Sequence, residues 1–335
     1  MRIAFKITIL LTLLFILMFI NLIWGSVDIS IETVFDVLFS RGGNDSDIGI
    51  IWKLRLPKIL TALIAGASLS VSGLLMQTFF RNPIAGPFVL GISSGASLGV
   101  ALLIMASGSL SALAFLGSSN WALIFMAMLG ACAVLFLLML VSLRIKDINT
   151  LLILGLMFGS ATSAIVALLQ YFSSQQALQQ FVLWSMGSLT GVTWEELYLL
   201  APVCCIVMIF CLGLSKTLDS LLLGDQYAIS MGVNVRKAQQ IIILSTAILA
   251  GSVTAFCGPI AFIGIAVPHL ARMFFKTHRH LLLILTTILI GMIIMLGCQF
   301  IAQLPGNHQI LPINVITSFL GAPMVIYIVL RKKSI

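Results

Sequence analysis

The chain has 335 residues, of which 60% are apolar and only 8% are charged. Soluble domains carry about 25% charged residues, so a composition this poor in charge excludes an ordinary hydrated surface. We therefore expect lipid to surround most of the chain. The net charge of +8 does not indicate nucleic acid as a partner, because no basic run interleaved with aromatic residues occurs outside Arg331-Lys332-Lys333.

Apolar segments of near-spanning length recur along the whole chain. A membrane-spanning helix needs roughly 20 residues. The candidate segments cover residues 7–24, 59–80, 88–107, 121–143, 151–171, 197–214, 240–257, 259–271, 281–302 and 311–330. The first is longer than the core of a signal peptide, which has about 7–15 residues, so we interpret it as a retained span. The sequence predicts an all-α polytopic membrane protein, in which residues 1–335 form a single domain of about ten transmembrane helices.

The basic residues predict how these segments are oriented. If the N-terminus is cytoplasmic and the segments alternate, Arg41, Lys53, Arg55 and Lys58 fall in the first outer loop, and every other Lys and Arg falls on the cytoplasmic side. Cytoplasmic loops carry an excess of Lys and Arg, so we expect both termini in the cytoplasm. The five tryptophans flank outer connections in the same topology, as interfacial anchors do.

Two of the outer connections are longer than a turn. In residues 30–40, Ile31, Val34 and Phe35 recur at helical spacing, which is typical of a short amphipathic helix lying on a membrane surface. Residues 175–188 carry four glutamines and no charge. We expect a second interfacial helix there.

Small residues form stripes on several of the expected spans. The second span carries Gly66, Ser70, Gly73 and Gln77 on one face, and the fifth span carries Gly155, Gly159, Ser160 and Ser163. Small residues let helices approach closely in lipid, so we expect the face of the second span to be buried in protein. Hydroxyl-bearing stripes can equally line a water-filled path, and the sequence leaves packing and lining open.

Any active transport by this chain needs an energy source outside it. No Asp, Glu, Lys or Arg falls near the middle of an expected span, whereas ion-coupled carriers usually place such groups there. This absence disfavours an ion-coupled secondary transporter, which we keep as the alternative function. The sequence also lacks a GxxxxGK[ST] phosphate loop, so we expect a partner chain to hydrolyse ATP and this chain not to be an enzyme.

We expect no metal and no cofactor in this chain. The six cysteines lie in apolar runs without CxxC spacing, which favours a packing role. His278 and His280 are flanked by Lys276 and Arg279, with no carboxylate or thiol nearby in the sequence. We expect these two histidines in a solvated inner loop.

Turn-forming residues interrupt the apolar sequence at residues 81–87 and 257–259. Irregular backbone at membrane depth is tolerated only against protein or a cavity, so we expect these breaks to be functional. The longest inner loop covers residues 215–239 and has apolar residues such as Leu223 and Met231 without a core of its own. This pattern favours a docking site for a cytoplasmic partner, and a helix lying on lipid is the alternative.

Several ordered motifs together resemble one known family. They are Arg55-Leu56-Pro57-Lys58, Arg81-Asn82-Pro83-Ile84-Ala85-Gly86-Pro87, and the stretches 90–96, 184–189, 223–233, 258–264 and 320–323. In this order they resemble the FecCD-type permeases of bacterial ABC importers for iron chelates, haem and cobalamin. The resemblance extends over nearly the whole chain.

The resemblance implies a cobalamin-importer-like (type II ABC importer) permease fold and an import function. The substrate would be a ferric siderophore, haem or cobalamin. The implied partners are two copies of a cytoplasmic ABC ATPase, an extracytoplasmic substrate-binding protein, a second permease copy in a homodimer, and the lipid of a bacterial cytoplasmic (inner) membrane.

The resemblance also implies roles for individual residues. Arg55 and Lys58 would dock the binding protein, although Gln299, Gln303 and Ile310 stand where similar permeases carry further charges. The cytoplasmic coupling loop would seat in the ATPase through Leu223, Gly224, Ala228, Met231, Gly232 and Val233. The inner gate and pathway would include Asn82, Pro83, Asn149, Gly155, Gly159, Ser160 and Ser163.

Overall fold

The computed structural model describes residues 2–25, 27, 29–39, 42, 44–106, 119–142, 145, 148–304 and 310–332. All regular elements in these ranges are helical. Seven helices are long and apolar enough to cross a membrane: α1 (Arg2–Ile23), α4 (Leu56–Phe79), α7 (Asn120–Ser142), α8 (Ile148–Phe172), α10 (Trp194–Gly213), α13 (Val235–Cys257) and α15 (His280–Gln303). Three further apolar helices are α5 (Ile92–Ala106), α14 (Ile263–Phe275) and α16 (Ile313–Lys332). The predicted all-α fold with about ten transmembrane helices is confirmed.

Two spans begin later than the hydropathy pattern predicts. The third starts at Ile92, because Pro87–Leu90 form a short 3₁₀ helix that ends at Gly91, whose φ is 73°. The eighth starts at Ile263 and follows Gly258-Pro259. Backbone with a positive φ precedes each of these helices, at Gly91 and at Phe262, whose φ is 67°, and such backbone cannot be part of a right-handed helix.

Short α-helices of the described residues that lie outside the spans are α2 (Ile31–Leu38), α3 (Asp45–Gly49), α9 (Gln175–Ser185), α11 (Ser215–Leu222) and α12 (Asp225–Ser230). Both predicted interfacial segments are helical, as α2 and α9. Ser30 caps α2 through the amide of Thr33, as serine commonly does at a helix start. Val34 of the expected stripe is buried together with Val37, whereas Ile31 and Phe35 of the same stripe are exposed.

Helix α4 lies at the centre of the bundle and packs against α13, α14 and α15. The stripe predicted to be buried is indeed buried, since Ser70 is 0% and Gln77 is 3% exposed. A Cβ atom on Gly66 would lie 2.7 Å from the Cβ of Met295 on α15, which is too close for any side chain. Glycine at this position therefore lets α4 and α15 approach closely in lipid.

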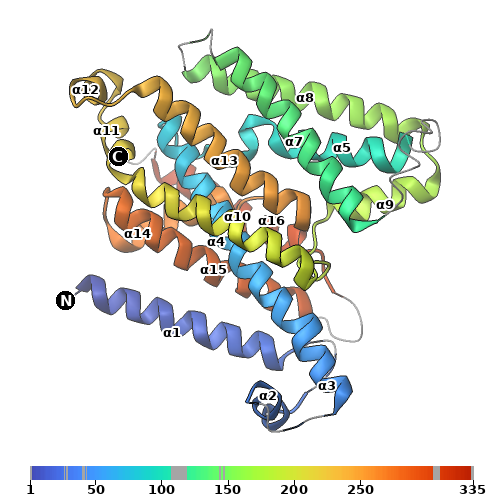
Figure 1. Cartoon of the computed structure of the whole chain (residues 1–335). Coiled ribbons are helices and arrows are strands. Elements are labelled where there is room, and N and C mark those ends of the chain that lie inside the picture. Colours follow the sequence, from blue (N-terminus) through green and yellow to red (C-terminus); the bar gives the residue numbers. More distant parts are fainter. Residues whose placement is uncertain are drawn as a thin grey trace.

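The two ends of the bundle carry different elements (Figure 1). The start of α1, the end of α16 and the pair α11–α12 lie together at one end, whereas α2, α3 and α9 lie toward the other. Helix α5 packs against both α7 and α8, and α1 packs along α15 at the edge of the bundle. Residues that are far apart in sequence therefore lie close together at each end of the bundle.

Candidate functional site

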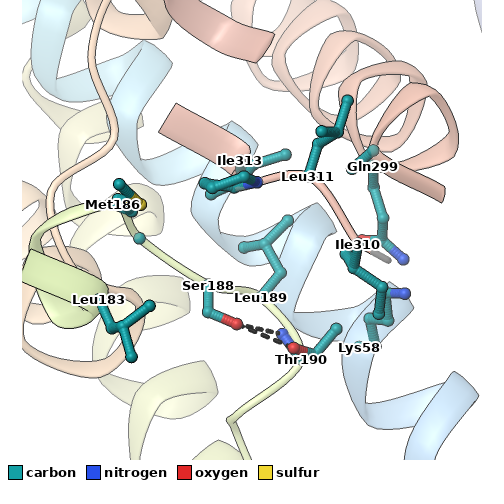
Figure 2. A pocket seen from close by; sticks show the side chains of 13 residues that line it. Lys58, Leu183, Met186, Ser188, Leu189, Thr190, Gln299, Ile310, Leu311 and Ile313 are labelled. Carbon is teal, nitrogen blue, oxygen red and sulfur yellow. Dashed lines mark hydrogen bonds between the residues drawn. The ribbon is translucent and has the colours of Figure 1, made fainter. Parts of the chain in front are cut away.

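A cavity of about 200 Å³ opens at the end of the bundle that carries α3 and α9 (Figure 2). It lies between the first turn of α4, the segment after α9, the last turns of α15 and the segment before α16. Its polar lining comes from Lys58, Ser188, Thr190 and Gln299. The hydroxyl groups of Ser188 and Thr190 bond each other at 2.8 Å, so these two residues partly satisfy one another.

The other two polar residues of the cavity lack partners. Gln299 is 2% exposed, and neither atom of its side-chain amide has a hydrogen-bond partner within the described residues. Lys58 is half-buried and makes no hydrogen bond or ion pair with any residue that the structure describes. Figure 2 shows the Gln299 amide and the Lys58 amine on the same side of the cavity, beside Ile310. The cavity therefore presents a positive charge and an unsatisfied amide.

Backbone contacts fix the wall formed by the segment after α9. The amide of Ser188 donates to the carbonyl oxygen of Cys257 at 2.7 Å, and the amide of Asn314 donates to the carbonyl oxygen of Met186 at 3.2 Å. Gly187 turns the chain between these contacts with a φ of 71°, in a region that favours glycine. The cavity wall is thus held by the end of α13 and the start of α16.

Arg55 differs from the expectation of an exposed docking residue, because its side chain is buried and 6% exposed. Its guanidinium donates to the carbonyl oxygens of Leu22, Ile23 and Val27, with a distance of 2.7 Å to Ile23. The last carbonyl groups of a helix have no partner within the helix, and a cation is favourable at that end. Arg55 caps α1 and holds the chain that follows it.

Gln303, where similar permeases carry a charge, also points inward. It is 8% exposed, and its amide donates to the carbonyl oxygen of Gln299 at 3.1 Å and to Asn21 on α1 at 3.4 Å. Of the positions considered for docking, Lys58 is the charged residue that faces the cavity.

The predicted coupling loop consists of α11, α12 and the turns around them, at the opposite end of the bundle. Leu223, Ile229 and Met231 are 66%, 61% and 59% exposed, which is unusual for apolar side chains at a polar end of a membrane protein. Ala228 is fully buried, so it packs within the loop and does not face a partner. The loop therefore presents an apolar surface made of Leu223, Ile229 and Met231.

Two glycines shape this apolar surface. Gly224 has a φ of 113° and Gly232 has a φ of 82°, both in the region that favours glycine. A Cβ atom at either position would meet no atom of the described residues within 4 Å, the adjacent residues aside. The backbone conformation, and not crowding inside this chain, requires glycine here.

The turn that follows α4 is tightly hydrogen-bonded. The amide of Arg81 donates to the carbonyl oxygen of Thr78, and the amide of Asn82 donates to that of Gln77, which is the Schellman pattern of a helix end. Arg81 occupies the position that usually holds glycine and has a φ of 48°, which costs roughly 1 kcal/mol or more. The side-chain oxygen of Asn82 accepts from the amide of Ile84 at 3.1 Å.

The predicted gate residues therefore do not act alike. Asn82 shapes the turn with its own side chain, and Pro83 is half-buried beside it. The side chain of Asn149 lies outside the described residues. We keep a gating role for this turn as a prediction.

The small residues of α8 separate into two groups. Gly155 faces the 3₁₀ helix before α5, where its Cβ would lie 2.6 Å from the carbonyl oxygen of Val89, and Gly159 lies against Gly91. Ser160 and Ser163 are exposed. The two glycines pack, and the two serines belong to the face of α8 that the described residues leave uncovered.

Comparisons with known proteins agree with this geometry. The sequence matches the FecCD transport family over residues 13–331. The chain belongs to the FecCD transport family. It is similar to the vitamin B12 import system permease protein BtuC of Vibrio cholerae, with 36% identity over 84% of this chain and 83% of BtuC. It is also similar to the hemin transport system permease protein HmuU of Yersinia pestis, with 37% identity over 89% of this chain and 88% of HmuU.

A solved structure supports the same assignment for the whole FecCD chain. It is described as a metal-chelate type ABC transporter in an inward-facing conformation. The two structures have a TM-score of 0.85 and 30% sequence identity, and they cover 98% of this chain and 99% of the other. The chain is a multi-pass membrane protein and the permease subunit of an ABC importer, a class that works with ATPase and binding-protein partners.

The structure of this FecCD permease places His280 where the sequence did not predict it. We expected a solvated loop, but His280 is 0% exposed. Its ring lies between Asp219 of α11 and Thr78 of α4, with hydrogen bonds of 2.7 Å and 2.9 Å. The expectation for His280 was wrong because α15 starts one residue earlier than the apolar run and carries this ring into the bundle.

A second polar contact joins α4 to α14. Arg272 donates to the side-chain oxygen of Gln77 at 2.5 Å, and the amide of Gln77 donates to the carbonyl oxygen of Ile265 at 3.0 Å. Nothing in the sequence pairs residue 77 with residue 272. Hydrogen bonds between polar side chains therefore connect α4 to α14 and to α15. They lie at the end of the bundle that the charge pattern predicts to face the cytoplasm.

Proposed function

We propose that this permease imports a metal chelate: a ferric siderophore, haem or cobalamin. The observation that carries the proposal is the likeness to the metal-chelate type ABC transporter, because it covers 98% of this chain at 30% identity. The relatives named for vitamin B12 and hemin transport support the same class of substrate. All three substrates are metal ions held in large organic ligands.

The permease works as a homodimer with two ATPase subunits. The exposed apolar surface of Leu223, Ile229 and Met231 supports the ATPase contact, because a water-exposed apolar patch of this kind marks a protein interface. The uncovered face of α8, which includes Ser160 and Ser163, supports a second permease copy beside it. A path between the two copies would be lined by small neutral side chains.

The binding protein docks at the cavity beside Lys58. Its half-buried ammonium has no partner in the described chain, so an acidic side chain of the partner can pair with it. A charge pair at such a rim adds orientation and association rate more than affinity. Because lysine is a point charge without the two-pronged geometry of arginine, we expect this docking to be sensitive to salt.

Transport follows alternating access, and no bond of the substrate is made or broken. Docking closes the Lys58 end, and ATP binding to the partner subunits moves the α11–α12 end, so that the two permease copies shift about their interface. The start of α1 and the end of α16 lie at the same end of the bundle as α11–α12 (Figure 1), and most Lys and Arg residues fall on that side in the predicted topology. We place this end in the cytoplasm and the protein in a bacterial cytoplasmic membrane.

Elemental mass spectrometry of cells tests the substrate. A strain lacking the gene and its complemented parent are each supplied with one ferric siderophore, haem or cobalamin, and cellular iron and cobalt are measured. Loss of iron uptake from one source in the deletion strain identifies the chelate, and loss of cobalt identifies cobalamin. Equal iron and cobalt in both strains under all conditions would contradict the proposed substrate class.

A further inference from the structure

The first turn of α15 is capped by a residue of another helix. Arg279 stands at the N-cap position of α15 and makes no side-chain capping bond. Instead, the carboxylate of Asp219 on α11 accepts from the backbone amide of His280 at 2.9 Å and from the ring Nδ1–H of His280 at 2.7 Å. A carboxylate at a helix N-terminus satisfies free amides and is favoured by the helix dipole. The start of α15 thus depends on α11.

The same histidine extends this contact into the centre of the bundle. The other ring nitrogen of His280 forms a hydrogen bond of 2.9 Å with the hydroxyl of Thr78 on α4, and both residues are almost fully buried. Buried polar groups are costly unless each is bonded, so the three side chains hold one another in place. Asp219, His280 and Thr78 form the first tether between the coupling loop and the spans.

Arg81 forms a second tether. Its Nε–H donates to the carbonyl oxygen of Leu221 at 3.2 Å, and its guanidinium forms an ion pair with Asp225, the first residue of α12. Arg81 keeps a φ of 48° at a helix end where glycine would be free of strain. Glycine at this position would remove the backbone strain, but it would also remove both side-chain contacts with the coupling loop.

The two tethers hold the coupling loop on both sides of its exposed turn. Asp219 precedes and Asp225 follows Leu223, which is 66% exposed. Both tethers end at the C-terminal end of α4, through Thr78 in its last turn and Arg81 in the turn that follows it. Helix α4 is the most buried of the long apolar helices that the structure describes, so a displacement of this turn reaches the centre of the bundle.

We propose that Asp219, Asp225, Arg81, Thr78 and His280 are positioning residues that fasten the coupling loop to α4 and α15. Through them, a movement that the ATPase imposes on the exposed turn reaches the transmembrane helices. The inference deepens the proposed function and rests on it for the ATPase, but the fastening itself is a property of this chain and can be measured alone.

Hydrogen–deuterium exchange of the purified permease in lipid nanodiscs tests the fastening. The variant is Arg81→Gly, which removes the side chain and relieves the strained backbone, so it does not prevent folding. Lys276→Gly is the matched control, because Lys276 also has a φ of 48° at a helix end and its side chain makes no hydrogen bond or ion pair with the described residues of the coupling loop. We expect amides of residues 219–231 to exchange at least roughly 5-fold faster in Arg81→Gly and unchanged in Lys276→Gly.

Reconstitution with the cognate ATPase and binding protein tests the transmission. The measured quantity is the amount of substrate moved per ATP hydrolysed. We expect this ratio to fall at least roughly 5-fold in Arg81→Asp, and to recover to within about 2-fold of the wild type in the charge exchange Arg81→Asp with Asp225→Arg. Thr78→Val, which removes only the hydroxyl, should lower the ratio in the same direction.

The outcomes separate the inference from the proposed function. Unchanged exchange of residues 219–231 in Arg81→Gly would overturn the fastening, whatever the uptake. If residues 219–231 exchange faster in Arg81→Gly but the substrate moved per ATP is unchanged in Arg81→Asp, the proposed transmission of movement through these residues is overturned. A wild-type complex that hydrolyses ATP but moves no metal chelate would contradict the proposed substrate, and the exchange measurement would still decide the fastening.

Discussion

Arg55 and Ile23 are joined by a hydrogen bond of 2.7 Å, in which the guanidinium of Arg55 donates to the last carbonyl group of α1. The contact links the start of α4 to the end of the first span. Because Arg55 and Lys58 are three residues apart, Arg55 also anchors the helical turn that carries Lys58. The two cations of this motif therefore differ in their roles, and the role of Arg55 is structural.

We expect Arg55→Met to destabilise the protein. The substitution keeps much of the side chain's apolar length but leaves carbonyl groups at the end of α1 without a donor, at a cost of about 2 kcal/mol. The melting temperature of the purified permease in detergent should fall, and Arg55→Lys should fall less because one donor group remains. A variant that melts with the wild type would show that Arg55 is dispensable for the fold.

Lys58→Glu should weaken docking of the binding protein without lowering the melting temperature. The half-buried ammonium has no partner in the described chain, so its loss breaks no internal bond, and the new carboxylate repels an acidic partner. We expect a loss of affinity of at least about tenfold at low salt that shrinks as salt screens the charges. Titration of the immobilised permease with its binding protein at two ionic strengths measures this.

The matched control for docking is Lys53→Glu, because Lys53 is a neighbouring cation that does not line the cavity. Equal losses of affinity in Lys53→Glu and Lys58→Glu would indicate a diffuse charge effect and contradict a specific role for Lys58. An affinity that is the same at low and high salt would also contradict the expected charge pair.

Gly232→Trp should uncouple ATP hydrolysis from uptake. A large side chain next to the apolar surface of Leu223, Ile229 and Met231 would separate this surface from the ATPase, and a φ of 82° is strained for tryptophan. Gly232→Asn is the control, since asparagine tolerates this backbone region better and is small. We expect uptake to be lost in Gly232→Trp and largely kept in Gly232→Asn. ATP-driven uptake at the normal rate in the tryptophan variant would remove residue 232 from the coupling surface.

The spans were predictable from the sequence, whereas the sites were predictable only in part. Hydrophobic length fixes a transmembrane helix almost alone, which is why the apolar segments match the helices within a few residues. The sequence, however, does not show whether a polar residue near the end of a span is solvated. Arg55 and His280 are both buried, because helices from other parts of the chain pack over them. Thr78 and His280 are 202 positions apart, and no local pattern brings them together.

The small residues of α8 illustrate the same limit. Glycine and serine are both small and have similar hydropathy, so the sequence pattern does not distinguish Gly155 from Ser160. The structure does so because Gly155 lies against the backbone of Val89 and Ser160 lies on the opposite, uncovered side. We expect that uncovered side to face the path between two permease copies.

Cysteine labelling tests whether Ser160 and Ser163 on the uncovered face of α8 are in contact with water. In a background where the exposed Cys132 and Cys205 are replaced by alanine, each serine is changed to cysteine and exposed to a water-soluble maleimide that does not partition into lipid. If both line the path between two permease copies, they should react at least roughly tenfold faster than a thiol in lipid, because the reagent reaches only wet positions. Quantitative mass spectrometry measures the labelled fraction over time.

Two reference positions make the labelling result decisive. Ile206→Cys on α10 is 66% exposed in the wild-type residue and should resist labelling, since we expect lipid around it. Gly155→Cys should resist labelling through close packing, because its Cβ would lie 2.6 Å from the carbonyl oxygen of Val89. If Ser160→Cys and Ser163→Cys react as slowly as Ile206→Cys, both serines lie in a dry surface, and the path runs along another face of the bundle. Fast labelling at the two serines alone places water on the uncovered face of α8 and makes that face the wall of the transport path.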